Sequence, residues 1–342
     1  MSDQQPKTLC VLFKYLGDVA VAVPAIRALQ RHQPHGELHL LVAEDAVPVV
    51  RHLPWVKRVW GFPRKRGSAQ WSRTLPILAA LRAEHFDWSV DFVGNDRGAL
   101  VSRLVGARQR VGLIPEGSFW GRKLCYTVRV PEESLSNDWV HESERHAHLL
   151  RRSLGVPLPG SLELEIHADP ILSEQAVLLS PGRPVIAHLS TSQPKKEWPV
   201  AMWHRLYERA KGAGVDFLFS TGPSPREQAL LAALRSIEPD IPVLPSADSL
   251  DLYLAVLSRA RGFVSGDTGP LHFAAGLGVP TLGIFAPTDA TRWAPVGQRH
   301  RHLRVWGCEC SGHAHACEKA APCIASVSVE SVWTALQSII EI

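Results

Sequence analysis

The first half of the chain alternates short apolar runs with segments of helical spacing. Apolar runs bounded by polar or glycine-containing loops are typical of buried strands. We predict strands over residues 8–13, 37–42, 56–60, 88–93 and 110–113. We predict helices over residues 19–30, 71–83, 97–105 and 141–154. Residues 114–138 show no clear period, and we expect an irregular connection there.

The second half restarts the same alternation after residues 156–183, which are rich in Pro, Gly and Ser and are interpreted as a domain linker. We predict strands over 184–189, 215–220, 241–244 and 281–285, and another that ends at Val264. We predict helices over 200–212, 225–237, 250–260 and 327–340. Alternating strands and helices indicate parallel sheets built from right-handed βαβ units.

These patterns predict an α/β protein with two Rossmann-like, doubly wound domains that face each other across a cleft. The N-terminal domain is expected at 1–165 and the C-terminal domain at 180–325. Residues 326–342 form a closing helix that is a candidate to pack back on the N-terminal domain. In such folds ligands bind at the carboxyl ends of the strands, so the loops that follow the strands are the places to search for chemistry.

The loop after the strand that ends at Val264 has the most distinctive composition. Gly266 and Gly269 allow a sharp turn and a close approach to a ligand. Pro270 suits the first turn of a helix, and the free N–H groups at a helix start favour a phosphate. Asp267, Thr268 and His272 accompany this turn. The segment is therefore either a phosphate-binding turn or an ordinary helix start.

Two loops of the first half carry candidate groups. The strand that ends at Phe13 is followed by Lys14, Gly17 and Asp18. An aspartate just before a helix either caps that helix or presents a carboxylate to the cleft as a general base. The strand over 88–93 is followed by Asn95 and Arg97, where the asparagine either forms the turn or faces a ligand.

Two further loops of the second half are compatible with a nucleotide. Thr191, Ser192 and Lys196 follow one strand, and hydroxyls with an ammonium group suit a diphosphate. Glu227 lies in the first turn of the helix that follows another strand. Each loop alone is also compatible with a polar surface, but their convergence favours a nucleotide site.

Composition narrows the class of protein. A formal net charge of +4 over 342 residues does not call for a nucleic acid partner. The polar residues 1–8 lack the apolar core of a signal peptide, and no run approaches the ~18 apolar residues that a membrane span needs. We therefore expect a cytoplasmic protein. Neither the dinucleotide fingerprint G-x-G-x-x-G nor the P-loop occurs, which argues against nicotinamide dehydrogenases and P-loop NTPases.

Four elements in chain order resemble the lipopolysaccharide heptosyltransferase family, glycosyltransferase family 9. They are Leu16-Gly17-Asp18-Val19 with Pro24 and Leu29; Val90-Asp91 with Asn95 and Arg97; Lys196-x-Trp198-Pro199; and Asp267-Thr268-Gly269-x-x-His272-x-Ala274-Ala275 with Pro280. The last is the family's most specific signature. The resemblance covers most of the chain and implies the two-domain GT-B architecture, an inverting transfer without a metal in catalysis, and ADP-heptose as the donor.

The resemblance also implies roles for individual residues. Asp18 would be the general base that deprotonates the acceptor hydroxyl. Lys196, Thr191 and Ser192 would hold the diphosphate, and the backbone of Thr268 and Gly269 would add N–H donors. Further substrate contacts are implied at Lys14, Gly17, Asn95, Arg97, Glu227, Asp267 and His272. The acceptor would be a lipopolysaccharide core or a related glycan, although the loop from Lys14 to Gly17 is shorter than is usual in the family.

A cysteine cluster follows the signature, at Cys308, Cys310, Cys317 and Cys323. It resembles a cysteine-rich segment of some family members, and four thiolates are a candidate set for a structural zinc or iron. The alternatives are free thiols or a disulfide that forms after purification. Catalysis requires no cofactor in this interpretation.

A basic, aromatic segment over residues 57–73 is either a solvated face, a site for an anionic lipid-linked acceptor, or a peripheral contact with the inner membrane. Alternatives for the function itself also stay open. One alternative keeps the reaction but has another nucleotide sugar as the donor, or a protein as the acceptor, as in autotransporter O-heptosylation. A second alternative is a module that binds nucleotides without transferring a sugar.

Overall fold

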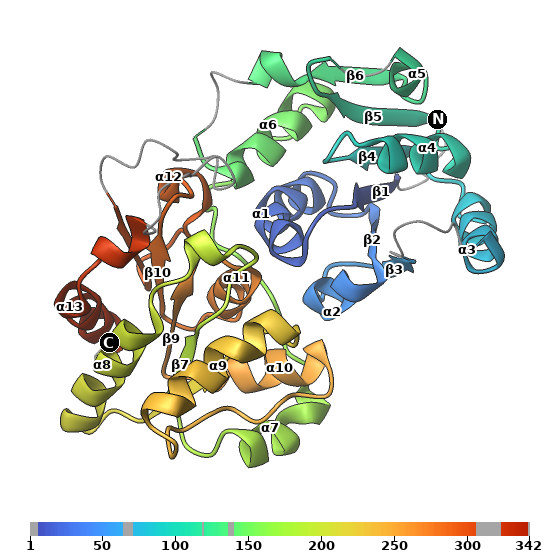
Figure 1. Cartoon of the computed structure of the whole chain (residues 1–342). Coiled ribbons are helices and arrows are strands. Elements are labelled where there is room, and N and C mark those ends of the chain that lie inside the picture. The colour runs from blue at the N-terminus through green and yellow to red at the C-terminus, as the bar shows by residue number, and fades with distance from the viewer. Residues whose placement is uncertain (1–5, 64–70, 118–119, 136–139, 306–322, 341–342) are drawn as a thin grey trace. The chain divides into compact units, whose positions relative to one another are not determined.

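A computed structural model describes residues 6–63, 71–117, 120–135, 140–305 and 323–340 of the protein (Figure 1). The chain divides into two compact units, Met1–Leu162 and Glu163–Ile342. Each unit contains a parallel β-sheet with helices between successive strands. In the described residues no helix has the length and apolar character needed to cross a bilayer.

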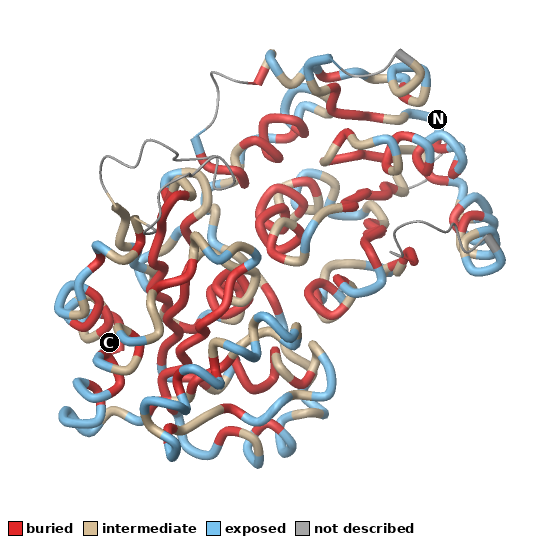
Figure 2. The backbone as a smooth tube through the Cα atoms, in the orientation of Figure 1, coloured by how far each residue is buried: buried red, intermediate tan, exposed pale blue. Residues whose placement is uncertain are grey.

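The first unit is built on a six-stranded parallel sheet with the order β3-β2-β1-β4-β5-β6 in the described part of the chain. Its strands are β1 (Lys7–Leu12), β2 (Glu37–Ala43), β3 (Arg58–Phe62), β4 (Trp88–Asp91), β5 (Gln109–Ile114) and β6 (Val128–Pro131). Its helices are α1 (Leu16–His32), α2 (Val47–Val50), α3 (Trp71–Ala83), α4 (Asp96–Val105), α5 (Trp120–Lys123) and α6 (Glu142–Leu154). Helix α1 packs against α6, and α3 packs against α4. The central strands are buried almost throughout, as expected of a parallel sheet between helices (Figure 2).

The second unit is built on a five-stranded parallel sheet with the order β11-β10-β9-β7-β8 in the described residues. Its strands are β7 (Val185–His188), β8 (Phe217–Ser220), β9 (Gly262–Gly266), β10 (Thr281–Phe285) and β11 (His300–Arg304). Its helices are α7 (Ser173–Leu179), α8 (Val200–Gly212), α9 (Pro225–Ile237), α10 (Leu250–Leu257), α11 (Gly269–Gly276), α12 (Ala290–Trp293) and α13 (Val329–Ile340). Strands β7, β9 and β10 are buried along their whole length.

Helix α13 packs on the second sheet. Its side chains Val332, Trp333 and Leu336 are buried in the same core cluster as residues of β7, β8, β9 and β10. The second sheet thus covers the apolar face of this helix. From the sequence, the N-terminal domain was a candidate surface on which this helix packs.

The structure differs from the hydrophobic pattern at elements with little apolar burial. Strand β6 lies within the stretch expected to be irregular, and α7 lies within the predicted linker with only Ala176 of its residues buried. The predicted strand at 241–244 makes only an isolated bridge, between Phe219 and Val243, in the described structure. Pro242 removes an N–H from this segment, so it cannot form a regular ladder.

Both sheets reverse their strand order at a point that matters for ligands. In the first sheet β2 and β3 lie on one side of β1, and β4, β5 and β6 lie on the opposite side of β1. In the second sheet β9 is added on the side of β7 opposite β8. The carboxyl ends of strands at such switch points form the crevice where doubly wound proteins bind ligands. The loops after β1, β4, β7 and β9 are therefore the positions of interest.

A buried carboxylate fixes one of these loops. Asp91 ends β4 with no solvent exposure, and its Oδ1 accepts hydrogen bonds from the N–H groups of Val93 (3.0 Å) and Gly94 (3.1 Å). The Tyr126 hydroxyl donates to Asp91 Oδ2 at 2.6 Å. Burial raises the pKa of Asp91, and the bond from Tyr126 is the first of several interactions that oppose this rise. Tyr126 thus joins the segment before β6 to the turn that leads into α4.

We predict that Tyr126→Phe destabilises the first unit by about 1–3 kcal/mol, because a buried carboxylate oxygen loses its donor. Urea unfolding followed by circular dichroism measures the change. Tyr207→Phe, which alters a buried tyrosine of the second unit, is the control. A Tyr126→Phe variant whose stability stays within about 0.5 kcal/mol of the original would contradict the role given to this hydroxyl.

Candidate functional site

In the first unit, the loop after β1 places a lysine against an aspartate. Lys14 Nζ lies 2.7 Å from Asp18 Oδ1, and the Asp18 side chain is 11% exposed. Helix α1 begins at Leu16 after Tyr15 as its N-cap, so Asp18 lies in the first helical turn and is not the cap. Gly17 is buried beside it. The alternative that Asp18 only caps the helix is therefore wrong, and its carboxylate is held by an ammonium group.

A second carboxylate reaches the same lysine from α6. Glu142 Oε1 lies 3.6 Å from Lys14 Nζ and 3.2 Å from Arg145 Nη1, and its side chain is 1% exposed. The Ser143 hydroxyl donates to the Val21 carbonyl at 2.8 Å, which holds the start of α6 against α1. The sequence predicts this helix but gives no sign that Glu142 meets Lys14, because the contact depends on how α6 packs.

His146 lies one turn beyond Glu142 and is buried against Phe92, with 5.5 Å between ring centroids. Burial lowers the pKa of His146 to about 3, although the charge of Glu142 opposes this shift. The imidazole is therefore neutral at physiological pH and adds no charge beside Lys14 and Glu142.

The loop after β4 is engaged in structural contacts. Asn95 is the N-cap of α4: its Oδ1 accepts from the Gly98 N–H at 2.8 Å, and its Nδ2 donates to the Phe13 carbonyl at 2.9 Å. The guanidinium group of Arg97 stacks on the rings of Phe13 and Phe62 and donates to the Pro63 carbonyl. The structure thus brings Asn95 and Arg97 to the end of β1, just before Lys14.

In the second unit, two loops separated by about seventy residues meet through an ion pair. Lys196 Nζ lies 2.7 Å from Asp267 Oδ2, a pair 71 positions apart in the chain, and both side chains are largely buried. Lys196 ends a short 3₁₀ turn after β7, and Asp267 follows β9. A Cβ atom on Gly266 would lie 2.8 Å from the Lys196 carbonyl oxygen, so only glycine lets the two loops approach so closely.

The loop after β7 is closed by its own side chains. The Thr191 N–H donates to Glu197 Oε1 at 3.0 Å, and its hydroxyl donates to the Gln193 carbonyl at 2.7 Å. Arg226 lies 2.6 Å from the same Glu197 oxygen and also donates to the Thr191 carbonyl. Ser192 is exposed at the tip of this loop. Glu197 and Arg226 were missed by the sequence interpretation.

The signature after β9 opens α11 as predicted. Thr268 is the N-cap and makes no side-chain cap bond, and Gly269 is the first residue of the helix. His272 is buried one turn into α11. The first N–H groups of a helix have no partner within the helix and carry its partial positive charge, so this turn is suited to an anion beside Lys196.

Glu227 pairs with Ser224, three residues before it, and the sequence contains the spacing that predicts this pair. Ser224 and Glu227 form a capping box at the start of α9, in which Glu227 Oε2 accepts from the Ser224 hydroxyl at 2.5 Å and from its N–H at 3.2 Å. The S-x-x-E spacing is the usual sign of this motif. Burial alone would raise the pKa of Glu227, but hydrogen bonds from Ser224 and Ser190 outweigh it and lower the pKa.

The remaining candidates lie away from these loops or outside the described residues. Cys308, Cys310 and Cys317 are outside the described residues, and Cys323 lies half-buried before α13. Among the residues that the structure does describe, no group of three or more His, Cys, Asp or Glu could hold a metal ion. In the basic segment, residues 64–70 are also undescribed, while Arg58 stacks on Trp60 and Arg73 pairs with Glu44.

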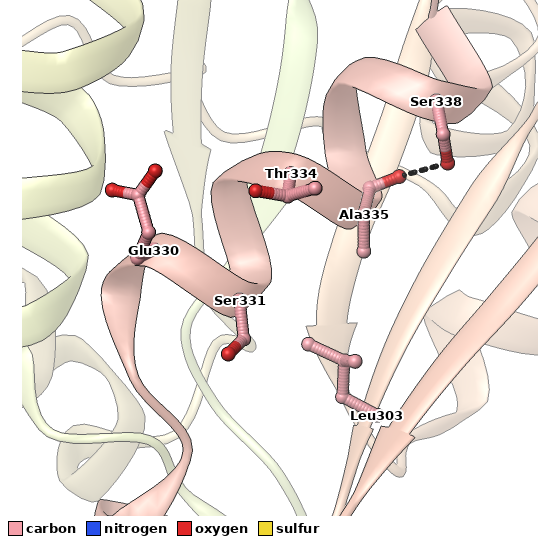
Figure 3. A pocket seen from close by; sticks show the side chains of 6 residues that line it. All are labelled: Leu303, Glu330, Ser331, Thr334, Ala335 and Ser338. Atoms are coloured by element: carbon pink, nitrogen blue, oxygen red, sulfur yellow. Dashed lines mark hydrogen bonds between the residues drawn. The ribbon is translucent and has the colours of Figure 1, made fainter.

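A hollow of about 430 Å³ lies elsewhere, between α13 and β11. Figure 3 shows its lining side chains Glu330, Ser331, Thr334, Ala335, Ser338 and Leu303. None of the predicted site residues lines it, so it is separate from the candidate site.

Taken separately, the two units offer different chemistry. The first presents a carboxylate, Asp18, that is fixed by an ammonium group and can accept a proton. The second presents Lys196 and the start of α11, which can hold and stabilise a phosphate-containing leaving group.

Comparisons with known proteins show the family to which the chain belongs. The model of glycosyltransferase family 9, described as heptosyltransferase, matches residues 75–323. Lipopolysaccharide heptosyltransferase 1 of Pseudomonas aeruginosa is 30% identical over 314 residues, which cover 87% of this chain and 83% of that protein.

Solved structures confirm the predicted α/β fold with two Rossmann-like parallel sheets. A glycosyl transferase family 9 protein from Veillonella parvula superposes with a TM-score of 0.81 at 17% identity, covering 100% of this chain and 99% of that one. The E. coli heptosyltransferase WaaC with ADP-2-deoxy-2-fluoro heptose gives a TM-score of 0.73 at 22% identity, covering 97% and 99%.

The neutral state of buried His146 predicts a specific loss of stability in acid. Below pH 6.5 an unfolded histidine takes up a proton, whereas the folded pKa of about 3 prevents this in the native state. Stability from His146 is therefore present above pH 6.5 and is lost as the pH falls toward 3. Between pH 7 and pH 5 the free energy of unfolding should fall by about 2 kcal/mol more in the original protein than in His146→Gln.

Urea titrations at pH 7, 6 and 5 measure this difference, with the exposed His35→Gln as the control that keeps the original pH dependence. Parallel pH dependence of the original protein and His146→Gln would show that His146 is not the group responsible.

Proposed function

The chain belongs to glycosyltransferase family 9, the heptosyltransferase family, and on that basis we propose that it transfers a heptose from ADP-heptose to a saccharide acceptor of the lipopolysaccharide core or a related bacterial glycan. The observation that carries this proposal is the 2.7 Å pair of Lys196 with Asp267 at the start of α11. It joins the two most informative motifs of the second unit at the switch point of its sheet, where a nucleotide sugar is expected.

The choice of donor is supported by the related proteins. WaaC was solved with an ADP-heptose analogue, and the Pseudomonas relative is named as a lipopolysaccharide heptosyltransferase. In this chain, we assign the diphosphate to Lys196, Thr191, Ser192 and the N–H groups at Thr268 and Gly269. Asp267 and His272 line the same position, and Glu227 receives the ribose.

The proposed reaction is a single displacement. Asp18 accepts the proton of the acceptor hydroxyl, and the oxygen attacks the anomeric carbon of the donor. The bond from that carbon to the diphosphate breaks, ADP leaves, and the new glycosidic bond has inverted configuration. Lys196 and the start of α11 offset the charge that builds on the leaving diphosphate, so no step is assigned to a metal ion.

The first unit is assigned to the acceptor. Lys14 holds the Asp18 carboxylate in place, and Gly17 lets the acceptor approach the backbone. Asn95 and Arg97 border the same loop. The proposal therefore divides the chain into an acceptor domain at 1–165 and a donor domain at 180–325.

We assign the reaction to the cytoplasm, close to the inner membrane, where a lipid-linked acceptor would be found. The exposed Lys57 and Arg58 side chains in the first unit support this location, since basic side chains favour an anionic lipid surface.

A nucleotide panel tests the donor. ADP at about a hundred times its Kd should raise the melting temperature of the second unit by about 5–10 °C, since ligand binding to the folded state adds about 2.7 kcal/mol. Lys196→Met should remove most of this shift, and Lys195→Met, its neighbour in the same loop, should retain it. A shift with UDP, GDP or dTDP in place of ADP would overturn the donor, and no shift with any of them would overturn nucleotide binding.

A second experiment tests the base. Asp18→Asn should lower kcat by about 10²–10⁴-fold, because the acceptor hydroxyl loses its proton acceptor while the donor contacts remain. Transfer from ADP-heptose to a lipopolysaccharide-core acceptor is measured alongside the ADP-induced thermal shift, which should not change. Asp45→Asn, at an exposed aspartate of the first unit, is the matched control. Near-normal turnover in Asp18→Asn would remove Asp18 from the mechanism.

A further inference from the structure

A buried histidine joins the ends of β7 and β8 through hydroxyl groups. His188 is 4% exposed, and its Nδ1 lies 2.9 Å from the Ser220 hydroxyl and 3.4 Å from that of Tyr253. Its Nε2 lies 3.2 Å from the Ser190 hydroxyl, which follows β7. His188 ends β7 and Ser220 ends β8, so these contacts lie where the loops with the proposed donor contacts begin.

Ser190 connects this histidine to the loop after β8. The Gly222 N–H donates to Ser190 Oγ at 2.9 Å, and the Ser190 hydroxyl is one of the groups that lower the pKa of the Glu227 carboxylate. A Cβ atom on Gly222 would lie 2.3 Å from Glu227 Oε1, so the carboxylate packs directly on the backbone of this loop. Ser190 therefore sits at the junction between His188 and Glu227.

The directions of these hydrogen bonds follow from the groups involved. An ionised carboxylate only accepts hydrogen bonds, so the Ser190 hydroxyl directs its proton toward Glu227. The two lone pairs of Ser190 Oγ then accept the Gly222 N–H and the N–H of His188 Nε2. Nδ1 of His188 is left as an acceptor for the hydroxyls of Ser220 and Tyr253. Burial lowers the pKa of His188 to about 4, which keeps the imidazole neutral, with one ring proton, at physiological pH.

Glu227 retains capacity for a ligand. A carboxylate offers about four acceptor positions, and the Ser224 N–H and the Ser224 hydroxyl occupy two of them. Glu227 is only half-buried, so its remaining acceptor positions can take hydroxyl groups from a bound molecule.

We propose that His188 is a positioning residue for the nucleoside of the donor: through Ser190 it orients the Glu227 carboxylate to accept hydrogen bonds from the ribose hydroxyls. This inference rests on the proposed function, since it takes ADP as the ligand and Glu227 as its ribose contact. His188 itself touches no substrate, and its effect passes through Ser190 and the backbone of Gly222.

The test compares ADP with 2′,3′-dideoxy-ADP, which lacks the ribose hydroxyls, by isothermal titration calorimetry. The original protein should bind ADP about tenfold or more tightly than the dideoxy compound, as expected for hydrogen bonds to a charged group. Ser190→Ala and His188→Phe should each weaken ADP binding by about tenfold and leave the dideoxy compound bound within about twofold of the original. The preference for ADP would then nearly vanish.

Two controls separate positioning from damage to the fold. Ser236→Ala removes a hydroxyl from the exposed face of α9, and His39→Phe removes a buried imidazole from the first unit; both should keep the original preference. Ser190→Ala, the milder of the two test variants, keeps the experiment informative if His188→Phe does not fold.

The outcomes distinguish this inference from the proposed function. Folded variants that keep the preference for ADP, or that lose affinity for both compounds by the same factor, overturn the positioning role alone. An original protein that binds neither compound overturns both the donor assignment and this inference. Equal binding of both compounds by the original protein overturns the ribose contact of Glu227 and, with it, the role of His188.

Discussion

The pairing of β7 with β9 is the constraint on which the second unit depends. These strands are separated in sequence by β8 and by helices α8, α9 and α10, yet their register places His188 opposite Ser265. Parallel strands end at the same edge of a sheet, so the loops that follow them must meet. The first unit repeats the arrangement with β1 and β4, where Asn95 binds the carbonyl of Phe13.

The strands and loops that carry the family resemblance could be predicted from the sequence because their signals are local. The run before Lys14 is apolar, the run after Arg183 is apolar apart from His188, and each ends in a loop with polar side chains. Strands β6 and β11 escaped prediction because they lie at sheet edges and lack an apolar run: Arg129 interrupts β6, and Leu303 is the one apolar residue of β11, His300–Arg304. Burial on both faces, rather than strand formation itself, produces a readable apolar run.

Side-chain partners across the fold were the least predictable part of the candidate site. Glu142 reaches Lys14 only because α6 packs on α1, and His188 reaches Glu227 only through a serine of its own loop and a glycine of the next. Neither pairing has a fixed spacing in the chain. The capping box of Ser224 and Glu227, in contrast, has such a spacing and could have been recognised from the sequence.

The loop that Glu197 closes onto Thr191 and Arg226 is held by hydrogen bonds within the second unit. A flexible loop of the same composition would lose conformational entropy on binding, and that loss would subtract from the affinity. Here much of that ordering occurs during folding of the second unit. Encounter with a ligand then requires little rearrangement of this loop, so differences in affinity among related ligands should arise mainly from how fast each one dissociates.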